Sequence, residues 1–95
     1  MADRDDISGD RDGGGGPLPT PDGISDCEGL LCPLPVLRAR KRLIAMRPGE
    51  VLCIRATDAM AAVDLPHFCA QTGHEYLGRR AEGAVMLHFI RAARA

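Results

Sequence analysis

The sequence predicts a mixed α/β (α+β) fold, a two-layer sandwich in which a mixed four-stranded sheet carries two helices on one face. Three observations predict it. Residues 33–46 repeat apolar side chains at helical spacing, residues 50–56 contain a continuous apolar run, and residues 74–91 hold two apolar segments separated by Glu82-Gly83. The order is therefore β-α-β-α-β-β, in which a right-handed crossover makes the first two strands parallel and the final hairpin adds an antiparallel pair.

The chain of 95 residues divides into a tail and one small domain. Residues 1–23 hold six Asp and two Arg, a net charge of −4, and nine of these 23 residues are Gly or Pro. Such a segment buries too little apolar surface to offset the entropy of ordering, so we expect a disordered acidic tail. Residues 24–95 hold ten Arg or Lys and seven Asp or Glu, a net charge of +3, and form the predicted domain. The total of −1 indicates neither a nucleic-acid partner nor an acidic substrate.

The first strand is expected at Ile24 to Cys27, followed by a turn at Gly29 and a helix from Pro33 to Met46. The helix ends at Arg47-Pro48-Gly49, because proline and glycine together are a strong stop signal. Its core-facing stripe has the spacing i, i+3, i+7, i+10 and consists of Val36, Ala39, Leu43 and Met46.

A second apolar cluster on this helix lies outside the stripe and runs back toward Cys32. It consists of Leu34, Leu37 and Ile44. Two interpretations stay open: the helix is broadly buried, or the cluster is an exposed patch that docks a partner protein beside the cysteine.

The second half of the chain predicts a strand, an interrupted helical stretch and a hairpin. Thr57-Asp58 offers a helix N-cap, Asp64-Leu65-Pro66 interrupts the helix, and Gly73 ends it. The predicted elements are a strand over Glu50–Ala56, helical pieces over Ala59–Val63 and His67–Thr72, and strands over His74–Ala81 and Ala84–Arg91.

Cys32 is the candidate catalytic residue, because Gly29 precedes it and Pro33 and Pro35 follow it at a predicted helix start. Proline is best tolerated in the first turn of a helix, which predicts Cys32 as the N-cap. The helix dipole and free N–H groups would then lower the pKa of the thiol and favour the nucleophilic thiolate. Position 35 is Pro rather than Cys, so the dithiol exchange of a C-x-x-C motif is not expected.

The four cysteines, at positions 27, 32, 53 and 69, predict neither a zinc site nor a secreted disulfide framework. Their gaps of five, twenty-one and sixteen residues lack the paired spacing of zinc ligands, so no metal is expected. No apolar segment resembling a signal peptide opens the chain, and no transmembrane span is present. We therefore expect a cytoplasmic protein with reduced thiols and no membrane partner.

Over residues 25–91 the chain resembles the TusA/SirA-like sulfur-carrier family. The C-P-x-P motif at Cys32 is specific, and the Pro-Gly-Glu break and the later Leu-Pro segment strengthen the match. The matching residues are Asp26, Gly29, Cys32-Pro33-Leu34-Pro35-Val36, Arg40-Lys41, Met46-Arg47-Pro48-Gly49-Glu50, Asp58, Asp64-Leu65-Pro66, Phe68-Cys69, His74-Glu75 and Gly83. The family's β-α-β-α-β-β fold agrees with the order predicted from the residues.

The resemblance implies a persulfide relay. Cys32 would accept sulfane sulfur from a cysteine desulfurase or a rhodanese-type donor and pass it to a downstream acceptor protein. The family's uses include tRNA 2-thiolation, cofactor sulfuration and sulfur oxidation. Arg40 and Lys41 correspond to basic family positions, which would steer the protein toward acidic partner surfaces. Leu34, Leu37 and Ile44 are the apolar candidates for docking the partner. No cofactor beyond the transient persulfide, no direct nucleic-acid contact and a monomer are expected.

The chain also departs from the family pattern. Position 34 is Leu where tRNA-pathway members often carry an acid, and the acidic tail lies outside the pattern. Cys27 lies five residues before Cys32, so a disulfide between them is conceivable. Two alternatives to the sulfur carrier therefore stay open: a non-catalytic interaction or regulatory domain that uses the apolar cluster, and a thiol redox sensor that pairs Cys27 with Cys32.

Overall fold

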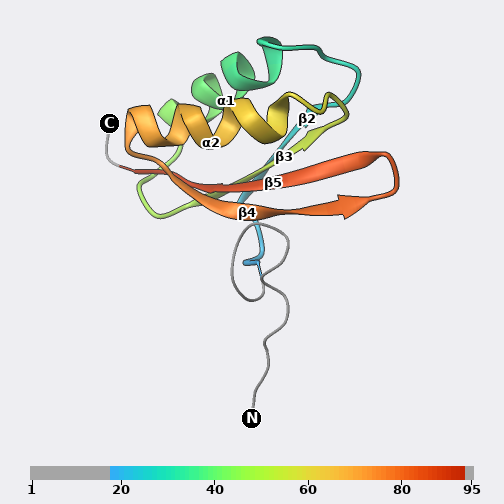
Figure 1. The fold of residues 1–95 in the computed structure, drawn as a ribbon. Coiled ribbons are helices and arrows are strands. Elements are labelled where there is room, and N and C mark those ends of the chain that lie inside the picture. Colours follow the sequence, from blue (N-terminus) through green and yellow to red (C-terminus); the bar gives the residue numbers. More distant parts are fainter. Residues whose placement is uncertain (1–17, 94–95) are drawn as a thin grey trace.

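The computed structural model describes residues 18–93 and shows the predicted two-layer sandwich, with both helices on one face of a four-stranded sheet (Figure 1). The elements in chain order are β2 (Gly23–Cys27), α1 (Leu34–Ala45), β3 (Val51–Ala56), α2 (Ala61–Thr72), β4 (Glu75–Glu82) and β5 (Val85–Arg91). The predicted fold class and element order are confirmed.

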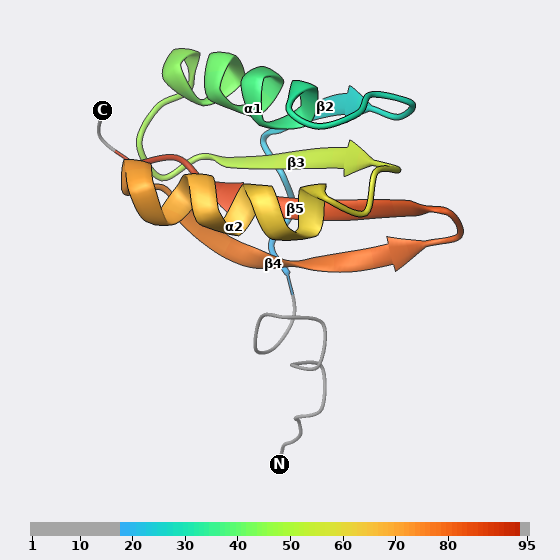
Figure 2. The same cartoon turned by 45° about the horizontal axis from the view of Figure 1, so that its top comes forward.

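The sheet has the strand order β2-β3-β5-β4 and is mixed, as expected. β2 and β3 are parallel and are joined by the α1 crossover, whereas β5 pairs antiparallel with both β3 and β4. The β2–α1 loop, the β3–α2 loop and the turn of the β4–β5 hairpin consequently lie at the same end of the molecule (Figure 2). This end carries the candidate site.

The main core lies between the sheet and the two helices. α1 contributes Ala39 and Leu43, while Val36 and Met46 pack partly buried against the same cluster, which confirms the stripe predicted for this helix. β3 contributes Leu52 and Ile54 on its helix-facing side. Because β3 is a central strand whose residues are buried on both faces, its sequence is a continuous apolar run.

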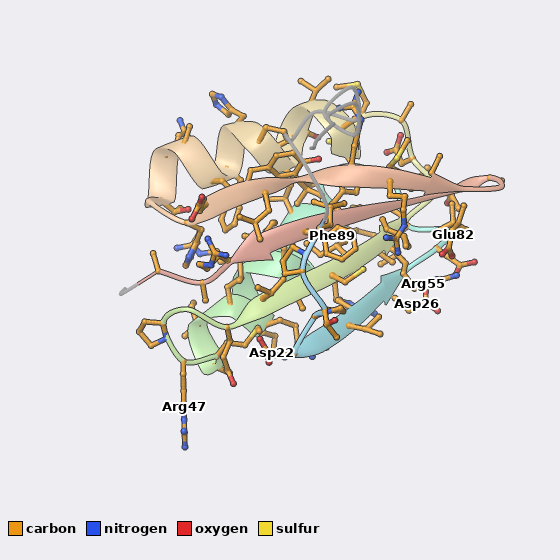
Figure 3. All side chains as sticks on the ribbon, turned by 90° about the horizontal axis from the view of Figure 1, so that it is seen from below. Asp22, Asp26, Arg47, Arg55, Glu82 and Phe89 are labelled. Carbon is orange, nitrogen blue, oxygen red and sulfur yellow. The ribbon has the colours of Figure 1, made fainter. Side chains whose placement is uncertain are left out.

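A smaller cluster covers the opposite face of the sheet. Val51, Cys53, Leu87 and Phe89 are buried there, and the Arg80 guanidinium lies 5.5 Å from the centre of the Phe89 ring. Figure 3 views this face, with Phe89 in its middle and Arg55, Asp26 and Glu82 grouped to one side. The buried role expected for Cys53 is confirmed.

The break predicted within the second helix is wrong, because α2 continues through Pro66. Proline removes one hydrogen bond and costs about 3 kcal/mol in a helix interior. Full burial of Leu65 and Phe68 contributes about 1.5–3 kcal/mol each, and Ala61 and Cys69 are buried on the same side. Packing of this face against the sheet therefore outweighs the local cost of the proline.

The folded part begins earlier than the predicted boundary at residue 24. Leu18 packs against the cluster on the open sheet face, and Asp22 exchanges hydrogen bonds of 2.8 Å with the backbone of Val51 through both its N–H and its carboxylate. Residues 18–23 thus contact the domain, while the predicted disorder of residues 1–17 falls outside the described residues. Between Leu18 and Ala93, no helix combines the length and the apolar character that crossing a bilayer requires.

Candidate functional site: the Cys32 loop

The loop between β2 and α1 is held against the β3–α2 loop by two hydrogen bonds. The N–H of Gly29 donates to Thr57 Oγ1 at 2.9 Å, and the N–H of Cys32 donates to Asp58 Oδ2 at 2.7 Å. Gly29 has a φ of +80°, a conformation that costs glycine little and other residues much more. These contacts present the side chain of Cys32 to solvent at the end of the sheet.

The start of α1 differs from the prediction by one residue. Pro33, not Cys32, is the N-cap, and the Cys32–Pro33 peptide bond is cis. Leu34 donates its N–H to Leu31 at 2.8 Å, and Pro35 lies buried in the first turn. Both prolines shape the helix start, as expected, but the cysteine belongs to the loop that precedes it.

The Cys32 thiol faces a carboxylate, not the positive end of the helix dipole. Its Sγ donates a hydrogen bond to Asp64 Oδ2 at 2.9 Å. This bond is the main cause that raises the pKa of Cys32; partial desolvation and the negative charges of Asp64 and Asp58 act in the same direction. The predicted lowering of the thiol pKa is therefore wrong for this arrangement, because the nearest charge is negative.

Sequence reasoning had not assigned Asp64 to the site. The residue lies in the first turn of α2, 32 positions after Cys32, and the sequence singled it out only within an Asp-Leu-Pro segment that interrupts a helix and matches the family. Its position beside the sulfur suits it to accept the thiol proton. The site therefore pairs a latent nucleophile with an adjacent proton acceptor.

Asp58 supports the loop through both of its carboxylate oxygens. Oδ1 accepts the N–H of Met60 at 3.1 Å, and Oδ2 accepts that of Cys32. These two bonds lower the pKa of Asp58, the Met60 bond having the larger effect, so its carboxylate is ionised at neutral pH.

The other three cysteines are buried, and all four thiols are free. Cys27 is 0% exposed, and its Sγ lies 3.7 Å from Ser25 Oγ. Burial raises the pKa of Cys69 to about 11 and also raises that of Cys53. Cys32 is thus the one accessible thiol, and the structure does not pair it with Cys27 as the redox-sensor alternative requires.

The apolar cluster predicted on the first helix is exposed, so the helix is not broadly buried, and docking of a partner on this cluster stays a prediction. Leu34, Leu37 and Ile44, here called the α1 apolar face, are 46%, 52% and 66% exposed. The basic docking candidates Arg40 and Lys41 are also exposed on α1. The sequence had not indicated that Leu31, Met60 and Val63, from the neighbouring loops and α2, are exposed as well.

Within residues 18–93, no three His, Cys, Asp or Glu side chains are grouped as metal ligands. The chemistry available at Cys32 is that of a thiol beside a carboxylate. Fold and site together define a class: a small α+β domain that presents a single accessible cysteine on a loop at one end of its sheet.

Residues 24–92 match the family model described as Sulfurtransferase TusA. The chain therefore belongs to the TusA family, and the resemblance inferred from the C-P-x-P motif is confirmed.

Curated relatives carry names that agree with this membership. The chain is 46% identical over 65 residues to the sulfur carrier protein TusA of Allochromatium vinosum, an alignment that covers 68% of this chain and 84% of the relative. It is 46% identical over 68 residues to the putative sulfur carrier protein YrkF of Bacillus subtilis, covering 72% of this chain but only 37% of YrkF.

A solved structure agrees with the fold. The crystal structure of a SirA-like protein from Desulfitobacterium hafniense superimposes with a TM-score of 0.63 at 27% sequence identity. The match covers 76% of this chain and 99% of that protein, so the two share the whole sandwich.

Proposed function

We propose that this protein carries sulfane sulfur as a persulfide on Cys32, accepting it from a donor protein and passing it to an acceptor protein. The observation that carries the proposal is that Cys32 is the one exposed thiol of the chain and lies on an anchored loop at the end of the molecule. Membership of the TusA family and the names of the relatives support the sulfur-carrier role.

In the accepting step, Asp64 takes the proton of the Cys32 thiol across the 2.9 Å hydrogen bond. The thiolate attacks the terminal sulfur of the donor's persulfide, so a bond forms between Cys32 Sγ and that sulfur while the donor's S–S bond breaks. The donor's thiolate leaves and takes a proton. The balance is a thiol and a persulfide giving a persulfide and a thiol, with no net oxidation and no cofactor.

The delivering step follows the same exchange in reverse. A persulfide is more acidic than a thiol, so the carried sulfur ionises beside the carboxylates of Asp64 and Asp58. Repulsion between these negative charges raises the free energy of the loaded state and favours transfer to the next protein. The raised pKa of the empty thiol has the complementary effect of keeping it protonated between partners.

In this proposal the donor is a cysteine desulfurase or a rhodanese-type protein, and the acceptor is a protein of tRNA 2-thiolation or of cofactor sulfuration. The exposed α1 apolar face, flanked by Arg40 and Lys41, is suited to dock an acidic, partly apolar surface on these partners. The same face would serve the alternative function, a non-catalytic interaction domain in which the thiol is unused.

The test is intact-mass spectrometry after incubation with a cysteine desulfurase and cysteine, without reductant, on wild type and Cys32→Ser. We expect wild type alone to gain the mass of one sulfur atom, and the gain to disappear on reduction. A gain in neither protein would indicate either a different donor, such as a rhodanese-type protein, or the interaction domain. Equal gains in both would place the sulfur on Cys27, Cys53 or Cys69 and refute the assignment of Cys32.

A further inference from the structure

A cavity of about 270 Å³ lies between the start of α2 and the β4–β5 hairpin. In Figure 2 these two segments lie at the same end of the molecule as the Cys32 loop. The walls consist of small and apolar residues together with four polar ones; they are Ala56, Thr57, Asp58, Ala59, Ala62, Arg79, Gly83, Ala84, Val85, Met86 and His88. The volume is many times that of one water molecule, whose share of the liquid is about 30 Å³.

His88 is one of the residues that line this cavity, and it holds a polar atom without a hydrogen-bond partner. The side chain is 0% exposed, and Nδ1 is 2.8 Å from the hydroxyl of Tyr76, but Nε2 has no hydrogen-bond partner. Buried polar atoms in folded proteins are almost always hydrogen-bonded, and leaving one unpaired costs about 1–3 kcal/mol. The sulfur-transfer chemistry at Cys32 does not use this histidine.

The neighbours of His88 decide which ring nitrogen carries the proton. Burial lowers the pKa of His88 to about 4, with a smaller effect from the charge of Arg79, so the ring is neutral at pH 7. Burial raises the pKa of Tyr76 to about 12, while the charge of Arg79 acts against this rise, so the hydroxyl keeps its proton at pH 7.

A phenol is a better hydrogen-bond donor than a neutral imidazole, and an imidazole nitrogen is the better acceptor, so the Tyr76 hydroxyl donates its proton to His88 Nδ1 at 2.8 Å. Nε2 is then the protonated nitrogen of the ring, an unsatisfied N–H donor. Arg79 and His88 are direct partners in the β4–β5 register, so both donors lie side by side on the helix-facing side of the hairpin.

We propose that this cavity binds the carboxylate of a small organic acid, or of a peptide end, with a short apolar body. Arg79 and the Nε2–H of His88 are the donors for the carboxylate, and Ala59, Ala62, Val85 and Met86 surround the apolar body. Asp58 is the acidic residue of the wall, but its two oxygens already accept the N–H groups of Met60 and Cys32.

This site goes beyond the sulfur-carrier function, although one residue joins the two. Asp58 lines the cavity and also holds the N–H of Cys32 at 2.7 Å. A bound carboxylate would therefore lie against the loop that positions the thiol. The proposal does not depend on sulfur transfer, because binding is measured on the protein alone.

The experiment is an NMR titration of the ¹⁵N-labelled full chain that follows the chemical shifts of the His88 ring nitrogens. One titrant is propionate, a small carboxylate, and the control titrant is propionamide, which has nearly the same size but no charge. We expect a saturable shift of Nε2 with propionate and none with propionamide. Arg79→Gln should weaken the affinity by about tenfold, as expected for one charge-assisted hydrogen bond. Arg80→Gln makes the same charge change on the opposite face of β4 and should leave the affinity unchanged.

A parallel titration compares a short peptide with a free C-terminus and the same peptide amidated. Tighter binding of the free peptide than of propionate, lost in Arg79→Gln, would identify a chain end as the ligand. Weaker or absent peptide binding beside a propionate response would identify a free acid. No saturable shift with either carboxylate, or equal affinities for Arg79→Gln and Arg80→Gln, would overturn the proposal and leave the cavity to solvent.

Discussion

Replacing Leu37 with alanine tests whether the α1 apolar face docks the sulfur donor. Leu37 is 52% exposed, so about half of its side chain remains to be buried by a partner. Full burial of a leucine side chain contributes about 1.5–3 kcal/mol, and covering the remaining half therefore contributes about 1 kcal/mol. Since 1.4 kcal/mol corresponds to about tenfold in affinity, we expect Leu37→Ala to raise the Kd about fivefold.

The assay is titration calorimetry of each variant against a cysteine desulfurase, with a thermal melt to check the fold. Ile24→Ala is the matched control, because Ile24 is 57% exposed but lies on β2 in register with Cys53 of the opposite face. Its Kd should equal that of the wild type. If Leu37→Ala also binds as tightly as the wild type, or if both variants weaken binding equally, the docking face has been assigned wrongly.

Three further changes test the site and the core. Asp64→Asn should lower the pKa of Cys32, because the carboxylate of Asp64 is the main cause that raises it. Alkylation of Cys32 by iodoacetamide at neutral pH should then become severalfold faster, and an unchanged dependence of the alkylation rate on pH would contradict the Cys32–Asp64 hydrogen bond. Leu43→Ala should reduce the free energy of unfolding in urea by about 2–5 kcal/mol, because Leu43 is only 2% exposed; a loss below 1 kcal/mol would contradict its place in the core. The pKa of His88 is about 4 in the folded protein and 6.5 in an ordinary, exposed histidine. The neutral ring therefore contributes about 3 kcal/mol to the free energy of unfolding above pH 6.5, and this contribution is lost as the pH falls toward 4. His88→Gln should lack this part of the pH dependence of unfolding, and identical pH profiles would refute a buried neutral ring.

Much of the fold was predictable because the signals are local. The helix over Leu34–Ala45 was visible from the spacing of Val36, Ala39 and Leu43, and β3 from its apolar run. The break at Pro66 was predicted wrongly, since a local rule cannot include the burial of Leu65 and Phe68 against a distant sheet. The N-cap was misplaced by one residue for a related reason: two prolines indicate a helix start without specifying which residue precedes the first turn.

Cys32 was identified from its neighbours in sequence, but its chemical state was not. A cysteine before a helix start predicts a lowered pKa if the dipole is the nearest source of charge. The crossover topology brings the first turn of α2 beside that of α1, and Asp64 thereby reaches the sulfur. A carboxylate in direct contact outweighs partial charges on backbone groups, so the direction of the shift reverses.

The sequence by itself determined the order of the elements and the family and indicated the candidate nucleophile, because periodicity, turn residues and the C-P-x-P motif act over a few consecutive positions. Only the tertiary structure decided which groups surround the thiol, that the α1 apolar face is exposed, and that Arg79, His88 and Asp58 line one cavity. These residues come from strands, helices and loops far apart in the chain. Their proximity depends on the folding of the whole sheet and its helices, which no local pattern encodes.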